Sequence, residues 1–366
     1  MYNIYYYFFS LILLFFLYSK LNHSILFTDI IEHSKYPQLD GLRGVLALSV
    51  IFHHSFIMYN YFLTSKWIDS PSIFYTLIGQ ISVILFFFIT GFLFGFKLLK
   101  SNFNMLSFYT NRIKRIIPLQ VFSVVLSFLV ILIIDNFLLK TSITTLSSTF
   151  IQWVFYGYFE QPLINNNSYS EVIETVYWTL IYEWKFYLTL PFLYFLKKYF
   201  LRKNTLFFLI LFIIVLLTKN IFILSFLFGI LSSYILHYQK NRNLYIVDIS
   251  AILSLFYIFF NYDSAYHRTV VLLLFIVFYT IINGNMFQKF LKNKILMFFG
   301  TISYSIYLLH NIVVFIVFYI LSTYIPINTL ESNTYWAIVF LILNLTIVLS
   351  FFSYVAIERK FYQRSK

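Results

Sequence analysis

The sequence contains no cysteine among its 366 residues, and only 11% of the residues are charged. A chain without cysteine forms no disulfide and has no thiol nucleophile. Soluble domains carry about 25% charged residues, whereas 61% of this chain is hydrophobic. A soluble core of this size cannot hide so much apolar surface, so the composition predicts a membrane protein.

Acidic residues are also scarce, with 13 Asp and Glu against 26 Lys and Arg, which gives a net charge of +13. In a soluble protein this excess would suggest binding to nucleic acid. In a protein with many membrane spans it reflects the excess of basic residues in cytoplasmic loops. We therefore expect this chain to contact membrane lipid and not to bind nucleic acid.

The apolar residues occur in blocks long enough to cross a hydrocarbon core of about 30 Å as helices. Lipid offers no partner to backbone polar groups, so these blocks are predicted to be helical. The sequence predicts an all-α fold, a polytopic transmembrane helix bundle of about ten core spans plus an additional N-terminal hydrophobic helix. The blocks are residues 4–18, 42–62, 74–99, 116–139, 178–198, 205–218, 221–237, 245–260, 268–284, 299–321 and 335–357.

The first block is not followed by a small-residue cleavage site, since the sequence Lys20-Leu21-Asn22-His23 is a poor match. Residues 1–35 are therefore interpreted as an N-terminal hydrophobic anchor and cytoplasmic linker, and residues 36–366 as one transmembrane domain. The sequence shows no Gly/Ser linker, internal repeat or appended soluble domain.

The distribution of basic residues predicts the orientation. If the segment before residue 42 is cytoplasmic, 20 basic residues lie inside and the opposite loops hold only Lys66, Lys140, Lys219 and Arg268. The C-terminus is then cytoplasmic. The inside set is Lys20, Lys35, Lys97, Lys100, Arg112, Lys114, Arg115, Lys197, Lys198, Arg202, Lys203, Lys240, Arg242, Lys289, Lys292, Lys294, Arg359, Lys360, Arg364 and Lys366.

The longest non-cytoplasmic connection covers residues 140–177 and carries Glu160, Glu171, Glu174 and three asparagines at 165–167. It is the obvious place for a lid or an acceptor-binding loop. A long polar loop without a function is an equal alternative.

Ionisable side chains within spans are costly, about 2.5–3.5 kcal/mol each at mid-bilayer, so they point to function. Arg43 and His54 are eleven residues apart, which places them on one helix face about 16 Å apart along the axis. His53 adjoins His54, and His310 lies at a similar depth in a later span, so a polar cavity between two imidazoles is expected. A structural hydrogen bond is the alternative for each histidine.

Arg112 and Arg115 are at i, i+3, so on a helix they share a face and their guanidinium groups can bind one polyphosphate. Anchoring at the cytoplasmic surface is the simpler alternative. Glu183 lies in an apolar stretch and needs a partner or a proton. A structural ion pair and a catalytic role are equally open for it. Glu358-Arg359 is interpreted as a possible interfacial pair.

Together these motifs resemble the membrane acyltransferase family 3, polytopic enzymes that O-acylate surface carbohydrates. The family's leucine-aspartate-glycine-leucine-arginine-glycine opening is matched by Leu39 to Gly44, with His54 eleven residues after the arginine. The departures are Thr90 and Thr179, which replace serines but keep the hydroxyl, and Lys185, a local cation that could hold Glu183 ionised. The other matched stretches are Phe86 to Phe92, Arg112 to Pro118, Trp178 to Tyr187 and Ser303 to His310.

The resemblance implies acyl transfer from acyl-CoA, most often acetyl-CoA, to a hydroxyl of a polysaccharide or lipid-linked oligosaccharide, without a metal. His54 is the expected general base, with Glu183, Tyr304 or His310 as alternatives for its partner. A bacterial inner membrane location and a lipopolysaccharide O-antigen acceptor follow from the resemblance alone. The expected catalytic residues are His54, Glu183 and His310, the donor-binding residues are Arg43, Arg112 and Arg115, and the supporting residues are Asp40, His53, Trp178, Tyr187, Ser303 and Tyr304.

Two other classes of protein fit a polytopic chain. A transporter or flippase of lipid-linked oligosaccharide also places ionisable residues at mid-membrane, but no two-fold repeat is found. A polysaccharide polymerase is expected to carry its functional residues on large external loops. In this chain the distinctive clusters lie in the spans and on the predicted cytoplasmic side, which favours a donor that enters from the cytosol.

Overall fold

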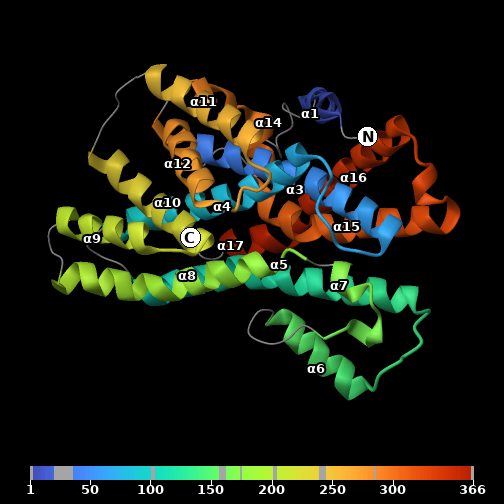
Figure 1. The fold of residues 1–366 in the computed structure, drawn as a ribbon. Helices are drawn as coiled ribbons and strands as arrows, with labels where there is room; N and C mark the ends of the chain where they lie inside the picture. The colour runs from blue at the N-terminus through green and yellow to red at the C-terminus, as the bar shows by residue number, and fades with distance from the viewer. Residues whose placement is uncertain are drawn as a thin grey trace.

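The computed structural model describes residues 3–19, 36–99, 104–155, 162–173, 175–200, 204–238, 245–283 and 286–363, and every regular element in these ranges is helical (Figure 1). The all-α prediction is therefore confirmed for the described chain. The helices are α1 (Ile4–Ser19), α3 (Pro37–Thr64), α4 (Ile73–Leu99), α5 (Met105–Ile134), α6 (Ile143–Val154), α7 (Ser170–Ile173), α8 (Trp178–Phe195), α9 (Asn204–Leu217), α10 (Ile221–Tyr238), α11 (Tyr245–Asn261), α12 (Arg268–Asn283), α13 (Met286–Leu291), α14 (Lys294–Thr301), α15 (Ser303–Tyr324), α16 (Ser332–Ser353) and α17 (Arg359–Gln363), with short 3₁₀ turns η2 (Ile164–Asn166) and η4 (Ile327–Thr329) and π-helical turns η3 (Leu196–Phe200) and η5 (Tyr354–Glu358).

Each of the predicted apolar blocks forms a helix, but the helices differ in length. Within the described ranges, six helical runs are long and apolar enough to cross a membrane: α3, α4, α5, α10, α15 and the run from α16 through Phe361. Helices α1, α11 and α12 are apolar but shorter. The chain is thus a multi-pass membrane protein, and the count of about ten core spans stays a prediction.

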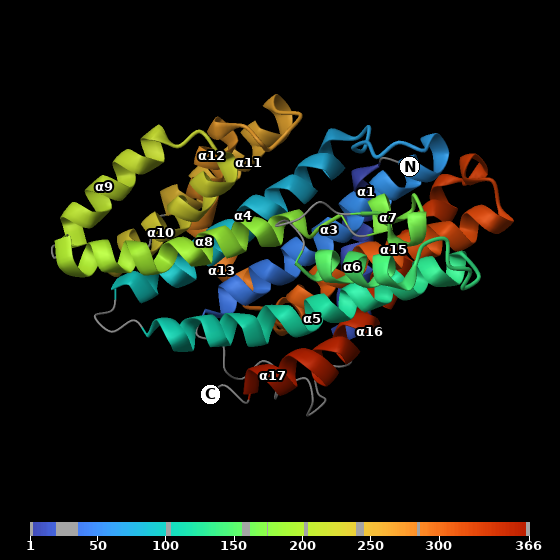
Figure 2. The ribbon, with the colours of Figure 1, turned by 90° about the horizontal axis from the view of Figure 1, so that it is seen from below.

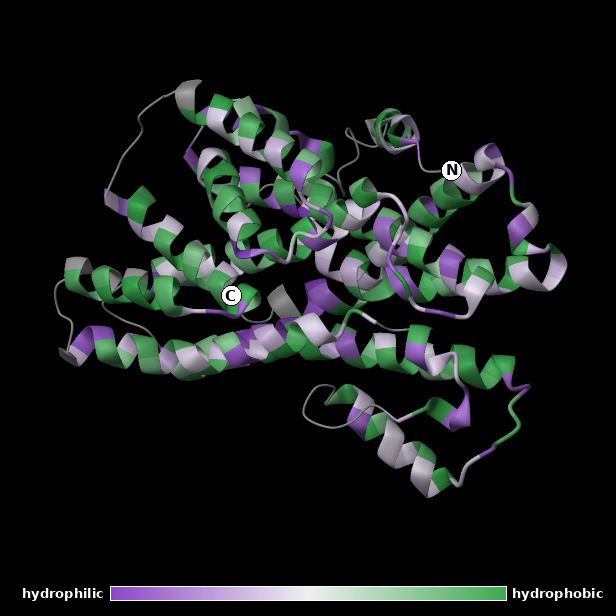
Figure 3. Cartoon of the chain, viewed as in Figure 1, coloured by the Kyte–Doolittle hydropathy of each residue, from purple (hydrophilic) through white to green (hydrophobic). Residues whose placement is uncertain are grey.

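The surface of the bundle is apolar, as a bilayer requires. Figure 3 shows hydrophobic residues on the outer faces of helices throughout the molecule. Leu209, Leu253 and Phe256, for example, are each more than half exposed. Soluble monomers rarely expose large contiguous apolar surfaces, so these faces are suited to contact with lipid.

Helix α3 crosses the middle of the bundle (Figure 2) and packs against α4, α14 and α15. Two glycines allow its backbone to touch that of α14. A Cβ on Gly44 would lie 2.3 Å from the carbonyl oxygen of Leu296, and one on Gly300 would lie 1.8 Å from that of Asp40. Small residues permit such close helix contacts in membranes, and this contact fixes the position of Arg43 next to them.

Helix α5 begins at Met105, earlier than the expected start at residue 116. Asn104 caps it by accepting a hydrogen bond from the backbone N–H of Ser107 at 3.0 Å, which satisfies one of the unpaired donors of the first turn. Apolarity alone could not reveal this start, because the first turns of α5 are polar. The earlier start places Arg112 and Arg115 on a helix, as the i, i+3 interpretation requires.

Helix α1 lies at the side of the bundle, near α14 (Figure 1). The Tyr7 hydroxyl is 3.0 Å from the Ser49 hydroxyl of α3, while Phe9 and Ile12 are exposed on the opposite face. Residues 20–35 of the predicted linker lie outside the described residues, as do Lys100, Arg202, Lys203, Lys240, Arg242, Arg364 and Lys366 of the predicted inside set. The orientation and the cytoplasmic C-terminus stay predictions.

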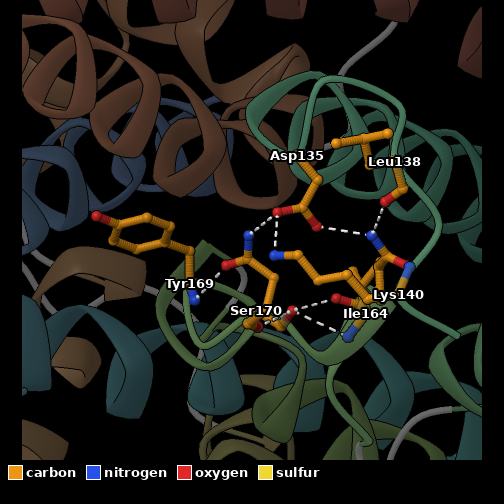
Figure 4. A network of polar contacts seen from close by, with 8 residues as sticks. Asp135, Leu138, Lys140, Ile164, Tyr169 and Ser170 are labelled. Carbon is orange, nitrogen blue, oxygen red and sulfur yellow. Dashed lines mark hydrogen bonds and ion pairs between the residues drawn. The ribbon is translucent and has the colours of Figure 1, made fainter.

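The connection from α5 to α8 is ordered by one buried carboxylate (Figure 4). Asp135 accepts hydrogen bonds from Lys140 Nζ at 2.5 Å, Asn165 Nδ2 at 2.7 Å and Asn167 Nδ2 at 2.9 Å. Asn165 has a φ of 53°, a left-handed conformation that asparagine tolerates better than most residues. The asparagine run therefore has a structural role in folding this loop. Glu160 and Glu174 lie outside the described residues.

Candidate active site

In the described part of the chain, two neighbouring cavities are both lined by Val83 and Tyr307. The first, called here the basic cavity, is also lined by Thr90 of α4, Glu183 and Tyr187 of α8, and the residues Arg43, Arg112, Arg115, Ser303 and Tyr304. The second, called here the histidine cavity, is also lined by His53, His54, Trp67, Asp69, Gln80, Trp178 and Tyr266. Because two residues line both, the cavities meet at Val83 and Tyr307.

The two cavities approach opposite ends of the helices. The basic cavity is built from the start of α3, the end of α4, the start of α5 and the start of α15, which the charge distribution predicts to be cytoplasmic. The histidine cavity includes Trp67, Thr175 and Tyr266 from the α3–α4, α7–α8 and α11–α12 connections, which are predicted to be non-cytoplasmic. A path from each side thus leads to the same point.

The basic cavity brings together the three predicted donor-binding arginines. Arg112 lies over the ring of Phe94, 5.1 Å from its centroid, and its buried Nε atom has no hydrogen-bond partner among the described residues. Arg43 Nη1 is 3.7 Å from a carboxylate oxygen of Asp40. A buried guanidinium with an unused donor is suited to an anionic ligand, so these residues fit a phosphate-bearing donor.

Glu183 lies in the basic cavity, not beside the histidines. Its carboxylate accepts hydrogen bonds from the Thr90 hydroxyl at 3.2 Å and the Tyr187 hydroxyl at 3.3 Å. Lys185 is exposed and lies over the ring of Tyr182 at 5.6 Å. No ion pair joins Lys185 to Glu183 among the described residues, because residues two apart on a helix do not face each other.

His54 and His310 contact each other directly: His310 Nε2 is 2.9 Å from His54 Nδ1. His310 Nδ1 lies 2.8 Å from the carbonyl oxygen of Tyr307 and 3.1 Å from that of Ile306. A carbonyl only accepts, so Nδ1 of His310 carries its hydrogen and Nε2 of the neutral ring is an acceptor. His54 therefore donates from Nδ1, with the carbonyl oxygen of Val50 as a second acceptor at 3.2 Å.

This assignment leaves the Nε2 atom of a neutral His54 with a free lone pair. Among the described residues nothing bonds that atom, and His54 lines the histidine cavity. Of the alternatives for the partner of His54, His310 is the one in hydrogen-bond contact. Tyr304 instead donates to the carbonyl oxygen of Ile116 at 2.9 Å.

Four further predicted residues line one cavity or the other, whereas Asp40 and His310 line neither. His53 lies in the histidine cavity with Nδ1 3.0 Å from the carbonyl oxygen of Tyr75. Its ring packs so closely on Gly79 that a Cβ there would lie 2.2 Å from the imidazole. Trp178 lines the histidine cavity, whereas Tyr187 and Ser303 line the basic cavity.

Sequence reasoning missed several residues of the site. Tyr307 lines both cavities, and its hydroxyl is 2.9 Å from the hydroxyl of Thr179. The retained hydroxyl of Thr179 was a signal for this contact, but no sequence pattern pointed to Trp67 or Gln80. The interfacial interpretation of Glu358 is also incomplete, since this carboxylate is buried and accepts a hydrogen bond from Ser305.

Comparison with known proteins decides the family. The profile described as an acyltransferase domain, of the acyltransferase 3 type, matches residues 36–355. The chain belongs to the acyltransferase 3 family. This confirms the resemblance deduced from the motifs, and the two cavities are the candidate active site of an acyltransferase.

Curated relatives of this acyltransferase come from Staphylococcus aureus. A protein named "Putative O-acetyltransferase" from strain COL is 26% identical over 89% of this chain and 57% of its own length. The O-acetyltransferase OatA of strain NCTC 8325 is 26% identical over 80% of this chain and 53% of its own. The acyltransferase chain therefore spans little more than half the length of these relatives. No solved structure matches it.

Proposed function

We propose that this membrane acyltransferase is an O-acetyltransferase that moves an acetyl group from cytoplasmic acetyl-CoA to a hydroxyl of a cell-surface polysaccharide, such as lipopolysaccharide O-antigen, or of its lipid-linked precursor. The proposed location is a bacterial inner membrane with the C-terminus in the cytoplasm. The O-acetyltransferase names of the relatives support the reaction. The separation of the basic and histidine cavities supports the supply of donor and acceptor from opposite sides.

The acyl donor is proposed to bind in the basic cavity. Arg112 and Arg115 share one face of α5, so their guanidinium groups can bind the phosphates of coenzyme A. Arg43 lies on α3 eleven residues before His54, a rise of about 16 Å. An extended pantetheine arm that follows α3 would bring the thioester to the point where the cavities meet.

His54 is proposed to act as general base at Nε2. It removes the proton from the acceptor hydroxyl while that oxygen attacks the thioester carbonyl carbon. When the carbon–sulfur bond breaks, the proton passes from the imidazolium to the thiolate, so the products are the ester and free coenzyme A. His310 positions the ring and accepts a stronger hydrogen bond from Nδ1 while His54 carries the positive charge.

The observation that carries the proposal is the His54–His310 hydrogen bond at 2.9 Å, which leaves His54 Nε2 free in a cavity that meets the three arginines. A purely structural histidine would use both nitrogens within the bundle. This arrangement supports a base in the histidine cavity that lies next to a donor site in the basic cavity.

Proton NMR of the polysaccharide from strains with and without the gene tests this function. We expect the acetyl signals to disappear on deletion and to return with the wild-type gene, but not with His54→Ala. His237→Ala, at an exposed position near the end of α10, is the matched control and should restore them. Loss of the polysaccharide itself on deletion would instead indicate a transporter or polymerase, and full acetylation by His54→Ala would refute the catalytic assignment.

A further inference from the structure

The non-cytoplasmic part of the histidine cavity combines an aromatic surface with unused polar groups. Trp67 is 37% exposed, and the centroid of its ring is 6.1 Å from that of His54. Asp69 follows two residues later in the same connection, and its backbone carbonyl accepts a hydrogen bond from Asn60 at 3.3 Å. The connection is thereby tied to α3, which holds both side chains beside the proposed base.

Gln80 supplies a hydrogen-bond donor whose direction is fixed. Its amide oxygen accepts hydrogen bonds from the backbone N–H of Ala265 at 2.7 Å and from the Ser264 hydroxyl at 3.0 Å. The backbone donor identifies the oxygen, so the other atom is the amide nitrogen. Gln80 is 7% exposed, and within the described ranges its nitrogen has no partner. Because Gln80 lines the histidine cavity, its N–H groups can donate hydrogen bonds to a ligand there.

Asp69 and Tyr266 complete a mixed set of donors and acceptors around the cavity. In the described part of the chain no side chain donates a hydrogen bond to the Asp69 carboxylate. Burial, together with the negative charge of Asp69, raises the pKa of the Tyr266 hydroxyl above its usual value, so this hydroxyl stays a hydrogen-bond donor. The cavity therefore offers an anionic acceptor and two neutral donors to one ligand.

We infer that Trp67, Asp69, Gln80 and Tyr266 form the acceptor subsite, which binds one sugar ring of the glycan with a hydroxyl at His54 Nε2. A sugar has an apolar C–H face and several hydroxyls that both donate and accept. The indole supports the face, the carboxylate accepts from one hydroxyl, and the amide and phenol donate to others. The inference rests on the proposed function.

A lipid acyl chain or a simple alcohol would not use these groups. An acyl chain would leave the Asp69 carboxylate and the Gln80 amide desolvated without partners, which is costly. A short alcohol with a single hydroxyl would leave most of the hydrogen-bonding groups of this cavity without a ligand partner. The arrangement thus favours a polyhydroxylated ring over other hydroxyl compounds.

The test uses the full chain in proteoliposomes, with acetyl-CoA and the polysaccharide purified from the gene-deleted strain. We expect Trp67→Ala and Asp69→Asn each to raise the KM for the polysaccharide about tenfold or more, with the KM for acetyl-CoA unchanged. Matched controls are Ile68→Ala and Asp263→Asn, exposed neighbours that do not line the cavity. Both controls should keep the wild-type KM for the polysaccharide.

The outcomes separate this inference from the proposed function. If the wild type transfers acetyl groups and both cavity variants keep its KM for the polysaccharide, the acceptor subsite is refuted while the function stands. If the wild type transfers no acetyl group to the polysaccharide, the function is refuted and the inference with it. Because Trp67 and Asp69 are exposed, their replacement leaves the folded core intact.

Discussion

The contact between the two histidines predicts how strongly His310 supports catalysis. His310→Ala removes the acceptor that lies 2.9 Å from His54 Nδ1. In the resting enzyme this bond joins two neutral rings and contributes about 0.5–1.5 kcal/mol, but with His54 charged it contributes about 1.5–3 kcal/mol. Only the difference affects the chemical step. Allowing for some loss of ring orientation, we expect kcat to fall about 10–100-fold.

A conservative variant separates this positioning role from a merely structural one. In His310→Gln the amide oxygen can accept from His54 Nδ1, so kcat should recover to within about tenfold of the wild type. Since His310 contacts His54 at Nδ1 and does not line either cavity, neither variant should change the KM for the donor or for the acceptor. His54→Ala should lose more activity than either, about 100-fold or more, as expected for removal of a general base.

Released coenzyme A is measured with a thiol reagent on purified protein in proteoliposomes, normalised to the amount of folded protein. The chain contains no cysteine, so the enzyme itself does not react. An unchanged kcat in His310→Ala would refute the reasoning. So would a loss as large as that of His54→Ala without recovery in His310→Gln, because His310 would then act by itself.

Three other parts of the structure give further predictions. Arg112→Gln and Arg115→Gln should each raise the KM for acetyl-CoA about tenfold, measured by initial rates, whereas Lys114→Gln, the same charge change outside the cavity, should not. Gly300→Ala places a Cβ 1.8 Å from a carbonyl oxygen of α3, so thermal unfolding in detergent should show a loss of about 1–3 kcal/mol. Burial opposes ionisation of Asp135, but its hydrogen bonds outweigh this and lower its pKa. The stabilisation of the folded loop by the ionised Asp135 carboxylate is therefore complete above the pKa of an unfolded Asp, about 3.9. It is lost as the pH falls through the lower pKa of Asp135 in the folded protein. Limited proteolysis of the 140–177 loop should increase across that window in the wild type but depend less on pH in Asp135→Asn.

The sequence predicted the parts of the site that depend on helix geometry. The separation of eleven residues predicted that Arg43 and His54 lie on one face of a helix. The separation of three residues predicted the same for Arg112 and Arg115. The similar depth of His310 and His54 predicted a polar cavity between two imidazoles, but the sequence left Glu183, Tyr304 and His310 as equal alternatives for the partner of His54. Spans of fixed length and known rise determine such positions, because the bilayer restricts where each helix lies along the membrane normal.

Other features could not be predicted, because they depend on which segments meet. Gln80 and Ala265 are joined by a hydrogen bond although they lie 185 positions apart in the sequence. No local sequence pattern predicts that contact. The place of Glu183 in the basic cavity depends on Thr90 of a different helix. The start of α5 was predicted too late because its first turns are polar, and hydropathy alone does not detect a capped, polar helix end.

The meeting of the cavities at Val83 and Tyr307 has an electrical consequence. A protein that opened a continuous aqueous route between cytosol and exterior would conduct ions down a potential worth about 2.3 kcal/mol per charge at 100 mV. In the proposed orientation, an ion that crossed the protein would have to pass Val83 and Tyr307, which line both cavities; the Tyr307 hydroxyl bonds to Thr179. Transfer of an uncharged acetyl group between the two cavities moves no net charge. The proposed reaction would therefore not dissipate the membrane potential.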